Sequence, residues 1–389
     1  MLNTALSPWP SFTQEEADAV SKVLLSNKVN YWTGSECREF EKEFAAFAGT
    51  QYAVAVANGT LALDVALKAM GIGAGDDVIV TSRTFLASAS CIVTAGANPV
   101  FADVDLNSQN ISAETVKAAL TPNTKAVIVV HLAGMPAEMD GIMDLAKEHD
   151  LWVIEDCAQA HGAKYKGKSV GSIGHVGAWS FCQDKIMTTG GEGGMVTTND
   201  KELWSKMWSY KDHGKSYDAV YHREHAPGFR WLHESFGTNW RMMEMQAVIG
   251  RIQLKRIPEW TARRQAHAAK LAESLGKFAG IRLIEVADYI EHAQYKFYAF
   301  VKPEHLKDGW TRDRIVAELN ARKVPCYQGS CSEVYLEKAF DNTLWRPKER
   351  LKNAVELGDT SLMFLVHPTL TDDEIAFCKE HIEAVLAEA

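Results

Sequence analysis

Residues 180–195 read SFCQDKIMTTGGEGGM, and this stretch decides both the fold and the chemistry expected of the chain. Its first residues end an apolar run, 177–182, that predicts a buried strand. Lys185 follows that strand closely, and the turn after it is rich in glycine. Partial burial lowers the pKa of a lysine amine and frees it to attack a carbonyl carbon. An isolated lysine is usually a solvated surface residue, so this interpretation needs a second group.

An aspartate at the end of another predicted strand supplies that group. The run 151–155 is apolar, and Asp156 follows it directly. Because ligands of doubly wound sheets bind beyond the carboxyl ends of the strands, we expect Asp156 and Lys185 at one site. A carboxylate there could cap a helix, bind a metal, or keep a cationic ring nitrogen protonated.

Strand and helix patterns alternate between residues 50 and 200, which predicts a three-layer α/β core with a mainly parallel sheet of seven strands. The expected strands are 52–56, 77–81, 99–104, 125–131, 151–155, 177–182 and 194–198. The expected helices between them are 59–70, 83–95 and 137–148.

The pattern changes after residue 200. A long helical stretch, 241–275, is interrupted at Pro258, where we expect a break or kink. The rest predicts a smaller α+β unit with a strand at 295–301 and helices at 311–322 and 372–387. We therefore expect an N-terminal segment and large domain over 1–255, and a small C-terminal domain over 256–389.

A candidate phosphate site follows the first predicted strand. Asn58, Gly59 and Thr60 open a helix there. Gly59 permits a close backbone approach, Thr60 offers a hydroxyl, and the N-terminus of a helix favours an anion. The same residues could equally form an ordinary helix cap.

Together these motifs resemble the DegT/DnrJ/EryC1/StrS family of sugar aminotransferases, which have the aspartate aminotransferase fold (fold type I). The resemblance rests on ANGT at 57–60, IEDCAQAHGA at 154–163, the 180–195 stretch, TNWRMMEMQAVIG at 238–250 and LVHP at 365–368. It covers almost the whole chain. The sequence departs from common family patterns at Cys157, at 182–184 and at 328–331, which weakens any transfer of substrate identity.

The resemblance implies a pyridoxal 5′-phosphate (PLP) cofactor, with pyridoxamine phosphate present between two half-reactions. It assigns Gly59, Thr60 and Ser180 to the cofactor phosphate, Phe85 to the ring face, Asp156 to the ring nitrogen, Gln159 to the 3′-oxygen, Lys185 to the covalent bond, and Asn239 to the phosphate of a neighbouring subunit. The last role implies a homodimer with shared active sites.

The implied reaction moves an amino group from L-glutamate to a nucleotide-linked keto-sugar, with Lys185 as the general base and acid. We expect a 4-keto-6-deoxy sugar and a product for lipopolysaccharide O-antigen or a related glycan. We assign substrate contacts to Tyr31, Trp32, Arg241 and His367. Three alternatives remain: a 3-keto-sugar substrate, another fold-type-I enzyme such as an amino-acid transaminase or desulfurase, and an inactive PLP-binding regulator.

Composition narrows the remaining possibilities. The formal net charge of −9 argues against nucleic acid or an anionic membrane as a partner. The seven cysteines are scattered, and the N-terminus lacks the pattern of a signal peptide, so we expect free thiols in the cytoplasm. Four histidines between residues 213 and 233 lack metal-ligand spacing, and we expect no metal site.

Overall fold

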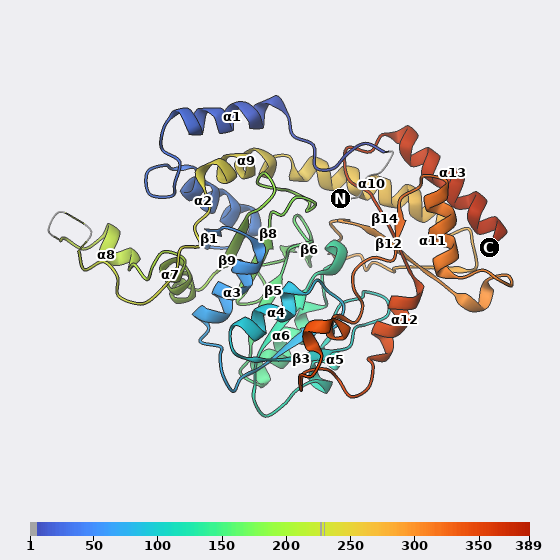
Figure 1. The fold of residues 1–389 in the computed structure, drawn as a ribbon, viewed down its shortest axis with the longest axis horizontal. Helices are drawn as coiled ribbons and strands as arrows, with labels where there is room; N and C mark the ends of the chain where they lie inside the picture. The colour runs from blue at the N-terminus through green and yellow to red at the C-terminus, as the bar shows by residue number, and fades with distance from the viewer. Residues whose placement is uncertain (1–5, 226–227, 229) are drawn as a thin grey trace.

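A mainly parallel sheet of seven strands forms the centre of the computed structural model, which describes residues 6–225, 228 and 230–389 (Figure 1). The spatial order is β1-β9-β8-β5-β4-β2-β3. Only β9 runs against its neighbours, β1 and β8, in this sheet. The strands are β1 (Tyr52–Val56), β2 (Asp77–Thr81), β3 (Asn98–Ala102), β4 (Thr124–Val130), β5 (Trp152–Asp156), β8 (Val176–Ser180) and β9 (Gly194–Thr198). The predicted α/β class is confirmed.

Both faces of this sheet are covered, because successive side chains of a strand point to opposite sides. In β4, Ala126 and Ile128 join one hydrophobic core, whereas Val127 and Val129 join another. The first core is covered by α2 (Glu36–Ala48), α3 (Gly59–Ala69), α4 (Ala87–Thr94) and α7 (Lys201–Tyr210). The second is covered by α5 (Ala113–Ala118) and α6 (Met139–Glu148). This is the expected three-layer arrangement.

The helix predicted over 83–95 begins only at Ala87, because the residues before it bond elsewhere. The guanidinium of Arg83 is fully buried and donates to Gln109 and Ser361, at 3.1 Å each. The backbone N–H of Thr84 donates to the carbonyl of Cys331. These long-range hydrogen bonds keep residues 83–86, which follow β2, out of the helical conformation.

Two helices occupy the predicted stretch 241–275. They are α9 (Glu244–Leu254) and α10 (Ile257–Leu275). Arg241 lies before them, in extended backbone bridged to Val56. Pro258 stands in the first turn of α10, where its missing N–H costs nothing, so it begins a helix and does not kink one.

A second, antiparallel sheet has the order β10-β12-β14-β13 and lies beside the first (Figure 1). Its strands are β10 (Ile281–Leu283), β12 (Phe297–Val301), β13 (Cys326–Tyr327) and β14 (Ser361–Phe364). Apolar side chains of α10, α11 (Arg312–Ala321) and α13 (Asp372–Glu388) form a core with it. Both predicted C-terminal helices are present, shifted by a residue at their ends.

The remaining elements are short or peripheral. They are α1 (Gln14–Leu25), which lies along α9, α8 (Tyr217–Tyr221), α12 (Lys352–Thr360), β6 (Lys164–Tyr165), β7 (Lys168–Ser169), β11 (Ile290–Glu291), and 3-10 turns at Leu132–Gly134, Pro303–His305, Val334–Leu336 and Lys338–Phe340 (Figure 1). Strand β11 pairs with β6, so a sheet crosses the predicted boundary at residue 255, and that boundary stays a prediction. Within the described ranges, no helix is long and apolar enough to cross a membrane.

Candidate active site

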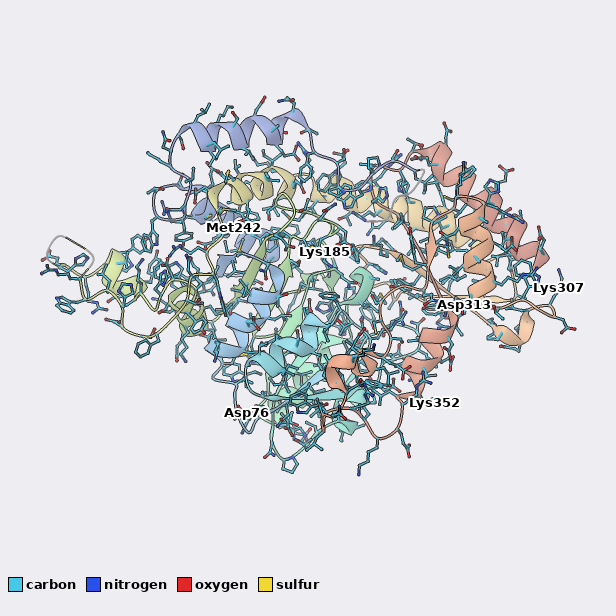
Figure 2. The ribbon with its side chains drawn as sticks, in the orientation of Figure 1. Asp76, Lys185, Met242, Lys307, Asp313 and Lys352 are labelled. Atoms are coloured by element: carbon cyan, nitrogen blue, oxygen red, sulfur yellow. The ribbon has the colours of Figure 1, made fainter. Side chains whose placement is uncertain are left out.

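The predicted site lies where β5 and β8 end, next to the start of α3. Asp156 is the last residue of β5 and Ser180 the last of β8, and these two strands are parallel neighbours. Lys185 lies near the centre of the molecule, between the large sheet and the C-terminal part (Figure 2). The carboxyl edge of a parallel sheet is where such folds bind ligands.

The carboxylate of Asp156 is buried and held in one orientation. Its Oδ2 accepts a hydrogen bond from the hydroxyl of Ser88 at 2.8 Å, and its Oδ1 accepts from the N–H of Ala158 at 3.1 Å. Burial raises the pKa of Asp156, while these hydrogen bonds and the charge of Lys185 lower it. The element after β5 is β6, a strand, so Asp156 caps no helix.

Lys185 extends into a mostly buried position. Its side chain is 17% exposed, and its Nζ lies 4.0 Å from Asp184 Oδ1. The same Nζ is 5.3 Å from the ring centroid of Tyr295, whose hydroxyl donates to Asp184. The indole N–H of Trp9 donates to the carbonyl of Lys185 at 2.9 Å. The main chain of Lys185 is therefore held by a residue remote in sequence, and its amine lies near its neighbour Asp184 and the ring of Tyr295.

The start of α3 approaches Ser180 so closely that only glycine fits between them. A Cβ on Gly59 would lie 2.5 Å from Ser180 Cβ, well inside contact distance. Asn58 caps the helix by accepting from the N–H of Leu61 at 3.0 Å, and Thr60 is exposed beside it. Helix N–H groups and two hydroxyls thus line one small cradle, which suits a phosphate.

The other predicted cofactor contacts differ in how far they are exposed. Phe85 is 71% exposed, so its ring is accessible to a ligand. Gln159 is buried, and its Oε1 accepts from the N–H of Ala133 at 2.7 Å, which fixes the amide group. Asn239 is exposed and bridged to Asp212, whereas α9 begins only at Glu244. Asn239 therefore does not stand at a helix N-terminus, because the backbone before α9 is extended.

The predicted substrate contacts form two groups: Tyr31, Trp32 and Arg241 lie near one another, whereas His367 lies elsewhere. Tyr31 is 2% exposed, and its hydroxyl bonds to Glu41 and Trp208 at 3.0 Å each, so it packs in the interior and is not free to contact a substrate. The ring of Trp32 contacts that of Tyr31 edge-on, with centroids 6.0 Å apart, and Lys215 Nζ lies 4.1 Å from the Trp32 ring centroid.

Arg241 is linked to Trp32 through Asp212 and Lys215, because Lys215 Nζ lies 3.3 Å from Asp212 Oδ1 and 4.1 Å from the ring centroid of Trp32. Arg241 Nη1 is 2.6 Å from Asp212 Oδ1. His367 lies apart from them. His367 stacks on Trp9 with ring centroids 6.1 Å apart and lines a separate cavity.

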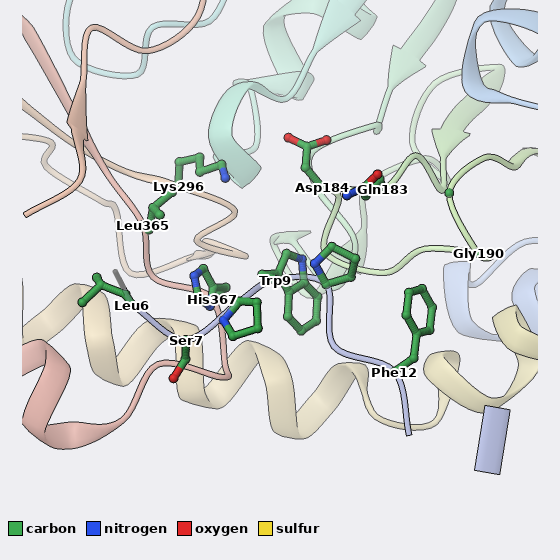
Figure 3. Close-up of a pocket in the computed structure, with 13 residues that line it drawn as sticks. Leu6, Ser7, Trp9, Phe12, Gln183, Asp184, Gly190, Lys296, Leu365 and His367 are labelled. Carbon is green, nitrogen blue, oxygen red and sulfur yellow. The ribbon is translucent and has the colours of Figure 1, made fainter. Parts of the chain in front are cut away.

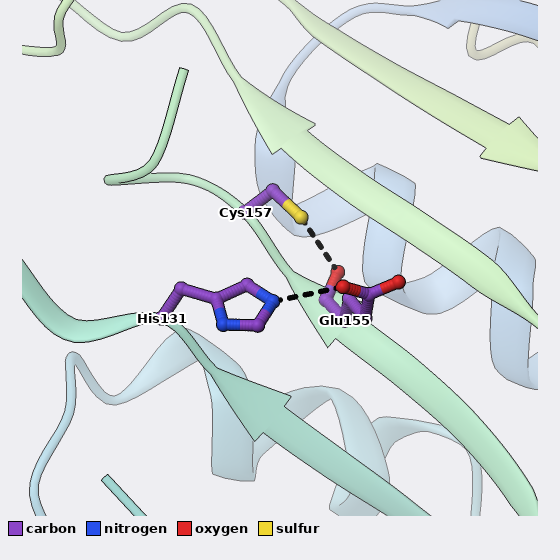
Figure 4. A group of neighbouring side chains, drawn as sticks. All are labelled: His131, Glu155 and Cys157. Atoms are coloured by element: carbon purple, nitrogen blue, oxygen red, sulfur yellow. Dashed lines mark hydrogen bonds and ion pairs between the residues drawn. The ribbon is translucent and has the colours of Figure 1, made fainter. Parts of the chain in front are cut away.

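Three buried side chains beside Asp156 offer ligand atoms close enough together for a metal (Figure 4). They are His131, Glu155 and Cys157. His131 Nδ1 accepts from the N–H of Ala137 at 3.0 Å, which assigns the ring proton to Nε2, and Nε2 donates to Glu155 at 2.9 Å. Glu155 also accepts three backbone N–H groups, from Gly171, Ile173 and Gly174. This cluster fixes the loop before β8, and its ligand atoms are already in use.

Sequence reasoning missed Ser88, Tyr295 and Trp9. Ser88 lies in the first turn of α4, where a serine is unremarkable. The other two come from opposite ends of the chain, and no local pattern links them to Lys185.

Comparison with known proteins gives one consistent result. The DegT/DnrJ/EryC1/StrS aminotransferase family matches residues 10–383. A solved structure of the aminotransferase from Psychrobacter cryohalolentis is 64% identical, with a TM-score of 0.96 over 98% of this chain and 99% of that one. GDP-perosamine synthase of Caulobacter vibrioides is 41% identical over 73% of each chain. The dTDP-3-amino-3,4,6-trideoxy-alpha-D-glucose transaminase of Streptomyces venezuelae is 36% identical over 83% of this chain and 79% of its own.

Proposed function

Because the chain belongs to the DegT/DnrJ/EryC1/StrS aminotransferase family, we propose that it moves an amino group from L-glutamate to a nucleotide-linked keto-sugar. Its dependence on PLP and its class, a sugar aminotransferase, follow from that membership and from its relatives. One observation carries the proposal: Asp156, Lys185 and the cradle between Gly59 and Ser180 meet at one edge of the sheet.

The residues present fit the cofactor. The cradle would hold its phosphate, Asp156 its ring nitrogen, and Phe85 one face of its ring. PLP, when bound, supplies an electron-accepting ring that stabilises negative charge on the carbon losing its proton. Asp156 suits this role because its buried carboxylate is oriented by Ser88 and Ala158 before any ligand arrives.

Lys185 has two tasks in this proposal. Its Nζ would bond to the cofactor in the resting enzyme. Once displaced by the amino donor, the same Nζ would carry a proton from the α-carbon of that donor. The fixed main chain of Lys185, held by the Trp9 indole, keeps the amine within reach of the cofactor site in both tasks.

The names of the relatives support a nucleotide-linked sugar. One relative is named for a GDP-linked amino sugar and another for a dTDP-linked one. The second name also places the amine at carbon 3. Within our proposal a 4-keto-6-deoxy sugar is the first candidate, and a 3-keto sugar is the second because of that relative. A product for lipopolysaccharide O-antigen or another glycan is part of the same proposal.

Assembly and location complete the proposal. We place the enzyme in the cytoplasm, as a homodimer in which Asn239 of one subunit contacts the cofactor phosphate of the other. The exposure of Asn239 in the single chain supports this, since a surface amide is free to meet a neighbouring subunit.

Two half-reactions test the function separately. L-Glutamate alone should convert the yellow enzyme to its pyridoxamine form, which is followed by absorption. UDP-, dTDP- and GDP-linked 3- and 4-keto-sugars should then be tested for their ability to restore the first spectrum. We expect one 4-keto-sugar to do so most rapidly. Restoration by 2-oxo acids other than 2-oxoglutarate, with every keto-sugar inert, would instead identify an amino-acid transaminase.

A further inference from the structure

A cavity of about 700 Å³ is lined by Asp184, the residue before Lys185, and by residues on both sides of it (Figure 3). None of the predicted cofactor contacts lines it. Four segments line it: the N-terminal segment, the loop around Lys185, the residue just before β12, and the segment after β14. The lining residues that matter to its chemistry are Trp9, Phe12, Asp184, Lys296, Leu365 and His367.

Positive charge dominates one side of this cavity. Lys296 points into it from the wall opposite Asp184 (Figure 3). Among the described residues, no carboxylate lies within ion-pair distance of Lys296, and its Nζ is 4.8 Å from the ring centroid of Tyr295. Burial lowers the pKa of Lys296 to about 8, so the amine is still largely protonated at neutral pH.

A second cation lies directly behind the wall. Arg264 is 1% exposed, and its Cζ is 5.0 Å from the ring centroid of Trp9. Nη1 donates to the carbonyl of Tyr295, but Nε and Nη2 have no hydrogen-bond partner within the described part of the chain. Burial lowers the pKa of Arg264 to about 9, which leaves it charged at pH 7.

Negative charge does not balance these two cations. Asp184 is the acidic residue of the lining, and its carboxylate is shared between Lys185 and the hydroxyl of Tyr295. His367 adds no positive charge at pH 7, because burial lowers its pKa to about 3. Buried cations without a counterion are costly, and an anion in the cavity would remove that cost.

We propose that this cavity binds the carboxylate of a small organic acid, with the ammonium of Lys296 as its direct partner. The apolar side chains of Trp9, Phe12 and Leu365 suit the hydrocarbon part of such an acid.

Two sources of that carboxylate are consistent with the position of the cavity. Asp184 lines it and also lies 4.0 Å from Lys185, so an occupant would be close to the reacting amine. The carboxylate could therefore belong to the amino donor itself, a reading that rests on the proposed function. Alternatively it could belong to a free acid that binds independently of the reaction.

Glutarate tests the site, because it resembles L-glutamate but has no amine to react with the cofactor. Calorimetric titration of the PLP-loaded enzyme should show binding to wild type, and Lys296→Met should weaken it by about tenfold or more, since a charge-assisted bond is lost. Lys296→Arg keeps the charge and should retain most of the affinity. Lys270→Met is the matched control: it removes a surface amine on α10 that pairs with Asp372 at 2.9 Å.

The outcomes are distinct. Equal affinity of wild type and Lys296→Met for glutarate, or no binding to wild type, would overturn the proposed site. Competitive inhibition of the L-glutamate half-reaction by glutarate would identify the donor as the source of the carboxylate. Binding that leaves this half-reaction unchanged would identify an independent acid. Because the titration involves no sugar, it remains informative even if every keto-sugar proves inert.

Discussion

Ser88 donates a hydrogen bond of 2.8 Å to Asp156 Oδ2, which joins the first turn of α4 to the end of β5. The remaining oxygen, Oδ1, accepts only a weaker backbone contact from Ala158, at 3.1 Å. Asp156 is thus held from two elements before a cofactor is bound. Its burial raises its pKa above the usual value, and the hydrogen bonds from Ser88 and Ala158 oppose that rise.

Substituting either Asp156 or Ser88 should reduce the rate of transamination. Asp156→Asn should retain PLP but lose most of the transamination rate, because a neutral amide no longer holds the ring nitrogen protonated. Ser88→Ala should lower kcat by about tenfold, the value of one hydrogen bond to a charged group. Ser90→Ala on the same helix is the control. Wild-type kcat in Asp156→Asn would refute the assigned role.

Lys185→Ala should abolish the covalent link to the cofactor. Borohydride reduction of the wild-type enzyme should fix the cofactor to Lys185, which peptide mass spectrometry can locate. The control is Lys166→Ala, which removes an exposed lysine paired with Asp140. An equal amount of fixed cofactor in Lys185→Ala would mean that another lysine forms the bond.

Mixed dimers should reveal whether Asn239 acts across the subunit interface. Lys185→Ala and Asn239→Ala protomers are each expected to have low activity. If Asn239 acts in the partner subunit, a mixed dimer has one site with both defects and one with neither, so activity recovers towards one intact site. A mixture of Lys185→Ala with Asp156→Asn should show no recovery, since both residues serve their own subunit. Failure of the first mixture to recover, despite verified exchange, would place Asn239 in its own site or outside both.

Gly59→Ala should weaken PLP binding more than it weakens folding. The added Cβ would lie 2.5 Å from Ser180 Cβ, so the phosphate cradle must open. Such overpacking costs about 1–3 kcal/mol, and we expect about a tenfold or larger rise in the Kd for PLP. Gly73→Ala, whose Cβ would meet ordinary contacts only, is the control. An unchanged Kd in Gly59→Ala would show that the phosphate binds elsewhere.

Stability should fall in mild acid because several histidines are buried in the neutral form. His292 Nδ1 accepts from the N–H of Gln294 at 2.9 Å, and burial lowers its pKa from 6.5 to about 3. Below pH 6.5 the unfolded chain takes up a proton that the folded chain refuses. The contribution of each such histidine to the free energy of unfolding should therefore be fully present above that pH. Below it, the free energy of unfolding should fall by about 1.4 kcal/mol per pH unit for each such histidine.

Urea unfolding between about pH 5 and pH 6.5 checks this. His292→Gln should have a shallower pH dependence than wild type, whereas His149→Gln, at an exposed position, should not. Identical slopes for all three proteins would exclude His292 as a source of the acid sensitivity.

Local pattern predicted the strands well and the segments between them less well. The bounds of β1, β2 and β9 are those expected, because each is an apolar run bounded by turn residues. The error at 83–86 has a tertiary cause, since Arg83 bonds to residues far along the chain. No local propensity records such bonds.

In the candidate site, too, some residues could be predicted from local sequence and others could not. Asp156 and Lys185 could be found because each follows a strand within a recognisable motif. Tyr31 could not be recognised as a buried residue from the sequence, because the residues that bond to its hydroxyl, Glu41 and Trp208, meet it only in the folded chain. Lys296 and Arg264 carry no motif, and their charge is notable only once their surroundings are known.

Glu155 and Asp156 are adjacent in β5, yet one anchors the loop before β8 and the other faces the candidate active site. Consecutive residues of a strand point to opposite faces of the sheet, so which carboxylate faces the site depends on the register of β5. An insertion of one residue before Glu155 in β5 would move Glu155 to the position of Asp156, leaving the loop unanchored and the site with the longer side chain. A deletion there would move Cys157 to that position and leave the site without a carboxylate. Any chimera or loop graft made with a relative must therefore keep the residue count of β5 and place its junctions outside 152–156.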